Sequence, residues 1–224
     1  MKKPMPYKTE AEMCAAFMAR ADNYMWKFYP ETGGWDFLAV RETDGIQVGF
    51  EAKLRPNVTL IRQMVQRMGR AQTPDYAACL IGARNDDLWT IGGALGFGVY
   101  FATDADHERG DHIEFHLSMA RRLSGPMIEI PKYTSDAIAG SPSPTPLSGW
   151  KIMALRAMVA YELNGHVTRA DLGAPVKQAT SFFYNYLEPA SKGARVPGLA
   201  VQRAPAHHPS AYAEIRREME GVAP

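Results

Sequence analysis

Apolar positions in the first part of the chain recur first with a helical period and then in a strand pattern. From Thr9 to Phe28 they return every three or four residues, which predicts an amphipathic helix. Two runs rich in aromatic and branched residues follow, Trp35–Glu42 and Ile46–Leu54, and Asp44-Gly45 lies between them. Asp-Gly between two such runs is a strong hairpin signal. The pattern therefore predicts a helix followed by a β-hairpin.

The positions after the hairpin predict another helix and two buried strands. A helical period runs from Val58 to Gly69, after the breaker Pro56-Asn57. Tyr76–Ile81 and Gly96–Phe101 are short, continuously apolar runs, a pattern typical of a covered and partly parallel sheet. The glycine-rich stretch Gly92–Gly98 is interpreted as a flexible turn into the second strand. We therefore predict an α/β fold, with a mixed sheet flanked by helices.

A Pro/Ser/Gly-rich segment at 140–149 divides the chain. Its composition is typical of an extended connector, so we expect one domain at 1–139 and a second at 150–224. The second domain has a mainly helical pattern, and we expect its helices at Trp150–Leu163, from Thr168, and at Pro175–Leu187.

The predicted hairpin brings acidic and basic side chains together on one face. With a two-residue turn at Asp44-Gly45, Asp36 lies opposite Lys53. Successive strand side chains alternate faces, so Glu51 shares the face of Lys53. Asp36 then joins both, with β-carbons about 5 to 8 Å apart. Two carboxylates beside a lysine predict a divalent-metal site with an adjacent cationic group.

Asp36 and the triplet Glu51-Ala52-Lys53 resemble the active-site motif of the PD-(D/E)XK nuclease superfamily, with Trp35 where that family often has proline. The similarity extends over about Thr9 to Phe101. It implies a restriction-endonuclease-like fold and a metal-dependent DNA endonuclease or exonuclease. It further implies that Asp36, Glu51 and the backbone carbonyl of Ala52 hold Mg²⁺ or Mn²⁺. Lys53 would then orient the attacking water or stabilise the transition state.

The flanking helices add further candidate residues. Glu10 falls in the middle of the apolar face of the first helix, whereas Glu12 lies nearly opposite and is explained by a capping box with Thr9. A buried acid needs a partner such as a metal, and members of the superfamily often have a glutamate here. The resemblance therefore favours Glu10, with Glu12 in reserve. In the second helix it implies that Gln63 or Gln66 places the phosphate.

The order of helices in the second domain resembles a winged helix-turn-helix. Its third helix would expose donors of the kind that reach phosphates and base edges, namely Lys177, Gln178, Ser181 and Asn185. The stretch 191–203 would form the wing and contribute Lys192 and Arg195. We expect this domain to bind DNA. The alternative is a small helical bundle used for packing or dimerisation.

Composition and charge bound these hypotheses loosely. No stretch approaches the ~20 apolar residues of a membrane span, and the N-terminus has no secretory signal. Cys14 and Cys79 lie singly in apolar segments, as expected for buried thiols in a reducing cytosol. We therefore expect a cytoplasmic protein that does not enter a membrane. The net charge is +1, with positions 1–140 slightly acidic and the remainder slightly basic, which weakly favours phosphate binding by the second half.

A competing hypothesis is a DNA-binding regulator or assembly factor whose nuclease-like half is only a scaffold. The discriminating feature is whether Asp36, Glu51 and Lys53 meet in space, because a scaffold has no reason to keep them together. A nuclease acting on RNA or on branched intermediates fits the same residues, and a structure-specific enzyme of this kind is often a homodimer.

Overall fold

The computed structural model describes residues 7–21, 25–102, 120–141, 146–190 and 194–221. The chain divides into two compact units. The N-terminal unit comprises Met1–Pro131 and Ala137–Pro144, and the C-terminal unit comprises Lys132–Asp136 and Thr145–Pro224. The chain therefore enters the C-terminal unit once before the proline-rich connector and again after it.

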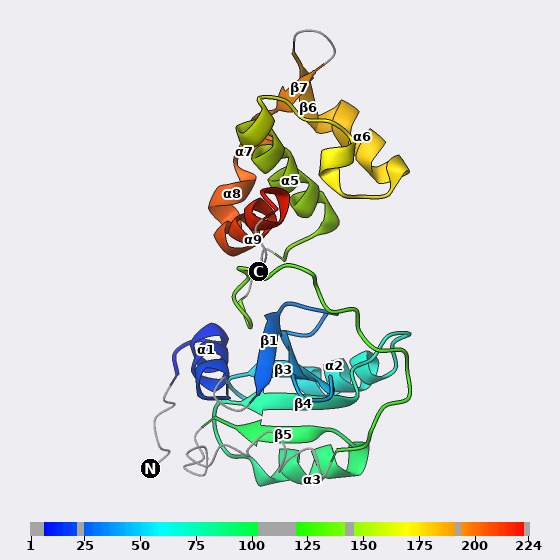
Figure 1. Cartoon of the computed structure of the whole chain (residues 1–224). Helices are drawn as coiled ribbons and strands as arrows, with labels where there is room; N and C mark the ends of the chain where they lie inside the picture. The colour runs from blue at the N-terminus through cyan, green and yellow to red at the C-terminus, as the bar shows by residue number, and fades with distance from the viewer. Residues whose placement is uncertain (1–6, 22–24, 103–119, 142–145, 191–193, 222–224) are drawn as a thin grey trace. The chain divides into compact units, whose positions relative to one another are not determined.

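The N-terminal unit is built on a five-stranded mixed sheet (Figure 1). The strands lie in chain order, the first three antiparallel and the last three parallel. They are β1 (Trp26–Pro30), β2 (Phe37–Arg41), β3 (Gln47–Lys53), β4 (Tyr76–Ile81) and β5 (Gly98–Phe101). The continuously apolar run predicted at Tyr76–Ile81 is confirmed as β4, which lies between β3 and β5 and is almost fully buried.

Helices cover both faces of this sheet (Figure 1). α1 (Glu10–Ala21) packs on one face, in a core where Phe37 and Phe50 stack with ring centroids 4.6 Å apart. α2 (Val58–Met68) and α3 (Asp86–Leu95) pack on the other, around Leu38 and Val99. The predicted α/β class, a mixed sheet flanked by helices, is confirmed. Both cysteines are buried free thiols, as expected.

The first helix ends earlier than predicted. α1 stops at Ala21, and the chain then forms β1, after Met25 with a positive φ of 64°. The prediction of helix as far as Phe28 was wrong because Trp26-Lys27-Phe28 also fits a strand. Aromatic residues favour a pleated, half-buried surface, and pairing with β2 satisfies the backbone of this segment.

The glycine-rich segment before β5 is helical, so its interpretation as a flexible turn was wrong. Asn85 caps the start of α3 by accepting from the Leu88 N–H, and Gly96 ends the helix with a φ of 85°. A β-carbon at Gly92 would lie 2.6 Å from the Val99 side chain. Glycine therefore allows α3 to approach β5 closely, which outweighs its low helix propensity.

The loop of the hairpin is longer than predicted. The Arg41 N–H donates to the Ile46 carbonyl (2.9 Å), which leaves the four residues 42–45 in the loop. Asp44 stabilises it by accepting from the Ile46 N–H and from the Arg41 guanidinium. This Asx-type closure uses the aspartate side chain where a two-residue turn would use backbone alone.

The longer loop changes the register of the hairpin. Phe37 pairs with Phe50, so Asp36 lies opposite Glu51 and the predicted pairing with Lys53 was wrong by two residues. Because strand side chains alternate with a period of two, a shift of two leaves each of them on its original face. Asp36, Glu51 and Lys53 therefore lie on one face as predicted, although their register differs from the prediction.

The C-terminal unit is mainly helical (Figure 1). Its central helix contacts each of the other helices. Its elements are α5 (Gly149–Asn164), η3 (Ala170–Leu172), α6 (Val176–Tyr186), β6 (Leu187–Pro189), β7 (Arg195–Pro197), α7 (Leu199–Gln202), α8 (Ala204–His207) and α9 (Pro209–Met219). None of the helices in the described ranges is long and apolar enough to cross a membrane.

The hairpin of the C-terminal unit lies earlier in the chain than the predicted wing at 191–203. It is formed by β6 and β7, and residues 199–202 form α7 instead of a second wing strand. Val167, before η3, makes an isolated bridge to Arg195 of β7. The strand after α6 was missed because Leu187-Glu188-Pro189 is too short to show a period.

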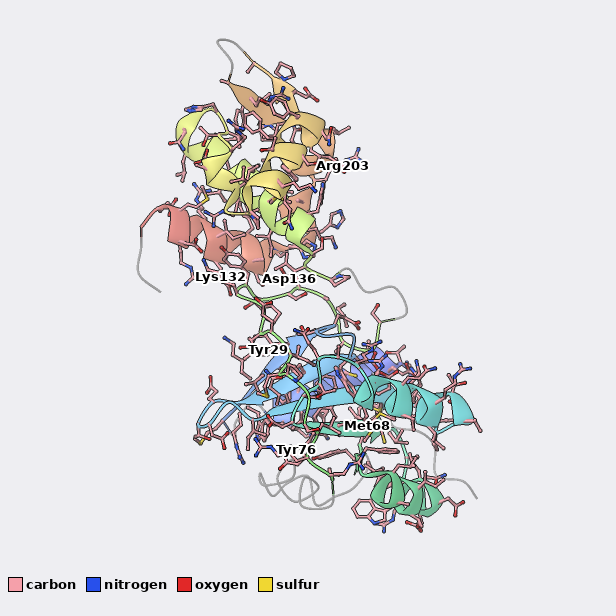
Figure 2. The ribbon with its side chains drawn as sticks, turned by 90° about the vertical axis from the view of Figure 1, so that its right-hand side faces the viewer. Tyr29, Met68, Tyr76, Lys132, Asp136 and Arg203 are labelled. Atoms are coloured by element: carbon pink, nitrogen blue, oxygen red, sulfur yellow. The ribbon has the colours of Figure 1, made fainter. Side chains whose placement is uncertain are left out.

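The five residues 132–136 extend the core of the C-terminal unit. Figure 2 shows Lys132 and Asp136 beside the last helix, α9. The Tyr133 hydroxyl donates to Glu218 at 2.8 Å, and Asp136 accepts from the Ser210 N–H at the start of α9. The boundary predicted at 139 did not include this excursion.

Gly49 provides a test of the packing beneath the candidate site. A β-carbon there would lie 2.5 Å from the buried ring of Trp35, so Gly49→Ala forces the indole or the sheet to move. We expect a loss of about 1–3 kcal/mol in the free energy of unfolding, measured by urea denaturation.

Gly93→Ala is the matched control, because its β-carbon meets nothing within 4 Å. In a helix that change is expected to stabilise by about 0.5–1 kcal/mol. Unchanged stability of Gly49→Ala would contradict the packing described.

Candidate active site

Charged side chains of the N-terminal unit gather where β3 ends and β2 begins. The sequence predicted four of them, Asp36, Glu51, Lys53 and Glu10, and the structure brings all four together. Two more, Glu31 and Arg67, join them. We call these six residues the carboxylate cluster.

Asp36 is held by two backbone groups of β3. Its N–H donates to the Phe50 carbonyl at 3.0 Å, and its carboxylate accepts from the Ala52 N–H at 2.7 Å. The N–H and C=O of one strand residue point to the same edge. The Ala52 carbonyl therefore faces the side on which Asp36 lies. Burial raises the pKa of Asp36, while the bond from Ala52 and the charge of Lys53 oppose that rise.

Glu51 is a buried acid beside a buried guanidinium. Its side chain is 1% exposed, and one carboxylate oxygen lies 2.7 Å from Nη1 of Arg67. These two atoms are not aligned for a hydrogen bond. Burial, followed by the charge of Asp36, raises the pKa of Glu51 to about 7. The Arg67 guanidinium also lies over the ring of Trp35, 5.5 Å from its centroid.

Lys53 connects the end of β3 to the first turn of α1. Its Nζ lies 3.0 Å from Oε2 of Glu10 and 4.0 Å from Oε1 of Glu51. Burial lowers the pKa of Lys53, but Glu10 and Asp36 outweigh it, so the pKa is raised and the ammonium stays charged.

The two acids at the start of α1 have different partners, as the sequence predicted. Glu10 also accepts from the Leu54 N–H (3.4 Å), which fixes it beside the end of β3. Glu12 forms the capping box with Thr9: each side chain accepts from the other residue's N–H, at 3.1 and 3.3 Å. Glu10, and not Glu12, therefore belongs to the cluster.

α2 presents its two glutamines differently. Gln63 is partly buried, and its Oε1 has no hydrogen-bond partner within the described part of the chain. Gln66 is exposed on the outer face of the helix. The residue of α2 that enters the cluster is Arg67, which was not among the predicted site residues. The available signal was spacing: Arg67 follows the buried Met64 by three residues and the buried Leu60 by seven, and residues at these spacings share a helix face.

Glu31 is the second residue that sequence reasoning missed. It follows β1 with a φ of 50°, and its N–H donates to the Asp36 carbonyl at 2.9 Å. Burial followed by the charge of Asp36 raises the pKa of its carboxyl to about 7, and the nearby Gly140 N–H opposes that rise. No periodicity marks Glu31, because the strand that positions it was itself predicted as helix.

The oxygen atoms available for a metal come from few side chains. Within the described ranges, no group of three or more His, Cys, Asp or Glu side chains is arranged to hold a metal ion. The predicted set uses two carboxylates, Asp36 and Glu51, with the carbonyl of Ala52. Such a set is all oxygen, which suits a hard cation such as Mg²⁺.

The candidate DNA-binding residues of the C-terminal unit lie mostly on the surface of α6. Lys177, Gln178, Ser181 and Asn185 are all exposed, and Asn185 donates to the Ser181 hydroxyl at 3.3 Å. Lys192 lies outside the described residues.

Arg195 is held against the end of α6. Its Nη1 donates to the carbonyls of Leu187 (2.7 Å) and Phe183 (3.3 Å), and its guanidinium lies 4.7 Å from the centroid of the Tyr184 ring. These contacts attach β7 to α6, so Arg195 has a structural role that the sequence did not indicate.

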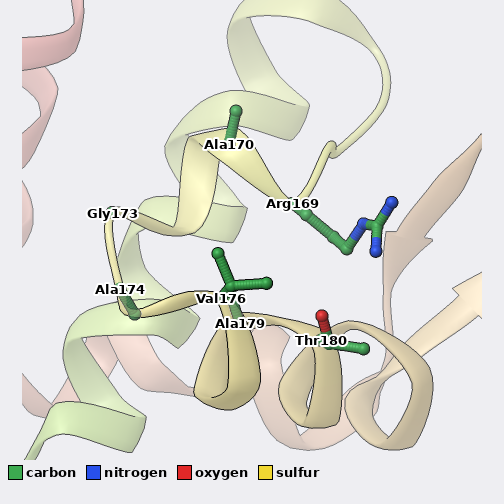
Figure 3. A pocket seen from close by; sticks show the side chains of 7 residues that line it. All are labelled: Arg169, Ala170, Gly173, Ala174, Val176, Ala179 and Thr180. Carbon is green, nitrogen blue, oxygen red and sulfur yellow. The ribbon is translucent and has the colours of Figure 1, made fainter.

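A hollow of about 470 Å³ separates η3 from the start of α6 (Figure 3). Small side chains form most of its wall, and Arg169 and Thr180 contribute the polar groups. Its lining residues all belong to the C-terminal unit, whereas the six residues of the carboxylate cluster all belong to the N-terminal unit.

Comparisons with family models, curated proteins and solved structures find no match to this chain. The similarity to the nuclease superfamily therefore depends on the arrangement of Asp36, Glu51 and Lys53 and on the order of the surrounding elements. The α/β class and the mixed sheet are features of the structure, whereas the restriction-endonuclease-like fold stays a prediction.

The two acids with raised pKa predict a pH dependence of stability. Glu31 and Glu51 each have a pKa of about 7 in the fold against an ordinary value of 4.5. The folded chain thus binds more protons than the unfolded chain between these values. We expect the free energy of unfolding to fall as the pH rises from about 4.5 to about 7. Glu51→Gln, measured in chelator by urea denaturation at several pH values, is expected to make that fall shallower. Identical pH profiles for wild type and Glu51→Gln would refute this assignment.

Proposed function

We propose that this chain is a metal-dependent DNA nuclease that hydrolyses phosphodiester bonds and has a C-terminal DNA-binding module. The observation that supports it best is the convergence of Asp36, Glu51 and Lys53 at the junction of β2 and β3. Asp36 bonds the backbone between the other two, and Lys53 lies 4.0 Å from Glu51. A hairpin that served only as scaffold would not need two acids and a lysine at its buried end.

The residues fit a hard divalent cation. Asp36, Glu51 and the carbonyl of Ala52 would hold Mg²⁺ or Mn²⁺ through oxygen atoms. When bound, the ion supplies charge neutralisation at the phosphate and lowers the pKa of water. Glu51 is 1% exposed, and its Oε2 is held by the Arg67 ion pair without an aligned hydrogen bond, so this oxygen could exchange that contact for a cation.

The remaining side chains of the cluster would orient the Lys53 ammonium and stabilise negative charge on the phosphate. Glu10 holds the Lys53 ammonium by an ion pair of 3.0 Å, which keeps this charge near the two acids. There Lys53 would stabilise the negative charge that develops on the phosphate oxygens. Arg67 lies 2.7 Å from Glu51 and has further N–H donors suited to a phosphate. Gln63, on the same side of α2, would position the phosphate.

The C-terminal unit supports the DNA-binding half of the proposal. Its order of helix, single bridge, short helix, helix and hairpin is similar to a winged helix-turn-helix. In that comparison α6 corresponds to the recognition helix. Its exposed residues Lys177, Gln178, Ser181 and Asn185 would then contact phosphates and base edges.

The central test is cleavage by variants of the cluster. We expect Glu51→Gln and Lys53→Met to reduce cleavage at least roughly 100-fold, because each removes a group that acts on the reacting phosphate. DNA binding should stay within a few-fold of wild type. Linear, circular, single-stranded and branched DNA are incubated with Mg²⁺, with Mn²⁺ and with chelator, and the products are separated on gels.

Glu42→Gln is the matched control for Glu51→Gln. Glu42 is exposed in the loop at the other end of the same hairpin, so it undergoes the same chemical change away from the cluster. It should cleave like wild type. Equal metal-dependent cleavage by wild type, Glu51→Gln and Lys53→Met would contradict the proposal.

A second candidate function is a DNA-binding regulator with an inactive nuclease-like scaffold. The observation that favours it is internal charge compensation: Arg67 pairs with Glu51, and Lys53 pairs with Glu10. Such pairs make the cluster stable without any ion. Tight DNA binding with no cleavage of any of the four DNA forms would favour this function. RNA cleavage in a parallel reaction would instead change the substrate class.

A further inference from the structure

The stretch from the end of β3 to the start of β4 has an unusual charge. Positions 52–74 contain five of the 16 Lys and Arg residues of the first 140 positions, and none of their 18 acids. The five are Lys53, Arg55, Arg62, Arg67 and Arg70. α2 occupies the middle of this stretch. A helix face that only promotes solubility commonly mixes both charge signs, and this one does not.

Two of these cations form ion pairs within the carboxylate cluster, and the other three do not. Lys53 pairs with Glu10, and Arg67 pairs with Glu51. Arg55, Arg62 and Arg70 are exposed and make no ion pair with the residues that the structure describes. Arg70 donates to the Gly33 carbonyl (3.1 Å), which joins it to the loop before Asp36. We call Arg55, Arg62 and Arg70 the arginine face.

The outer side of α2 is not covered by any of the described residues of the N-terminal unit. Val58 is 82% exposed and Val65 is 52% exposed. Arg62 lies between them along the helix, and Gln66, about one turn further, is exposed as well. Figure 2 shows α2 from the side, with Met68, its last residue, labelled. The surface thus offers guanidinium and amide donors separated by small apolar contacts.

We infer that the arginine face binds the phosphate backbone of DNA beside the carboxylate cluster. This inference rests on the proposed function and names a surface that the function needs. A cluster with four carboxylates repels a polyanion, and a nearby strip of positive charge offsets that repulsion. Guanidinium groups match phosphate oxygens, and contacts of this kind position a duplex without reading its sequence.

The position of the arginine face relative to the cluster supports this occupant. Arg67 follows Arg62 by five residues, so the two point about 140° apart around α2, and Arg67 lies against Glu51 and the ring of Trp35. Arg70 then contacts the loop that leads into Asp36. A DNA strand that crosses the C-terminal end of α2 would therefore pass from Arg62 by way of Arg70 to the cluster. A small anion would not need three separate guanidinium groups spread over positions 55–70.

The test is a salt titration of DNA binding by the full chain in chelator, where hydrolysis does not interfere. Arg55→Gln/Arg62→Gln is compared with wild type on one duplex, with Kd measured by fluorescence anisotropy. We expect about tenfold or greater weakening at low salt. We also expect the slope of log K against log salt to fall by about 2, at about 0.9 for each lost phosphate contact.

Arg20→Gln/Lys27→Gln is the matched control. Both residues are exposed on α1 and β1 of the same unit, so the control loses the same net charge away from α2. It should bind within about twofold of wild type, with an unchanged salt slope. Unfolding midpoints are measured for both double variants, and Arg62→Lys should recover part of the affinity because it restores the charge.

The outcomes separate this inference from the proposed function. If wild type cleaves DNA but Arg55→Gln/Arg62→Gln binds with unchanged affinity and salt slope, the arginine face is not the DNA contact and the nuclease proposal stands. If the variant loses affinity but wild type cleaves nothing, the face is a DNA contact and the nuclease proposal fails. Absence of DNA binding by wild type overturns the inference and leaves an acidic protein as the partner for this surface.

Discussion

The start of β2 is joined to the end of β3 by the two hydrogen bonds of Asp36, one from its N–H to Phe50 and one to its carboxylate from Ala52. The second bond is short, at 2.7 Å, and the acceptor is an acid in a largely buried setting. An unpaired Ala52 N–H at this point would have a substantial desolvation cost. The same bonds place Glu51 and Lys53 beside Asp36, so strand pairing and the assembly of charged groups are one structural event.

The carboxylate cluster is an arrangement of buried and partly buried charges that depend on each other. Glu51 is stable in its position because Arg67 is beside it, and Lys53 because Glu10 is beside it. Buried ion pairs of this kind seldom increase stability over apolar packing, but removing one partner is costly. Acids with a raised pKa at a strand end are also frequent at functional sites. The cluster is therefore easier to explain as a chemical site than as a source of stability.

The proposed division of roles follows from charge. The carboxylate cluster would attract cations, the arginine face beside it would attract phosphate, and α6 would add contacts from a separate unit. Polyanion binding by dispersed basic residues needs no deep pocket. A nuclease with this plan would hold DNA through two surfaces and act on it at a third.

Local sequence determined the elements whose pattern is unambiguous: β4, α2, the capping box of Thr9 and Glu12, and the face shared by Glu51 and Lys53. These depend on period and on neighbours within four residues. Only the tertiary structure decided that Trp26–Pro30 is a strand, since its partner lies on β2. It also decided that Arg67 faces Glu51 and that Glu31 lies beside Asp36. The physical reason is that a buried charge is compensated by whichever opposite charge folding brings near, and that partner has no fixed distance along the chain.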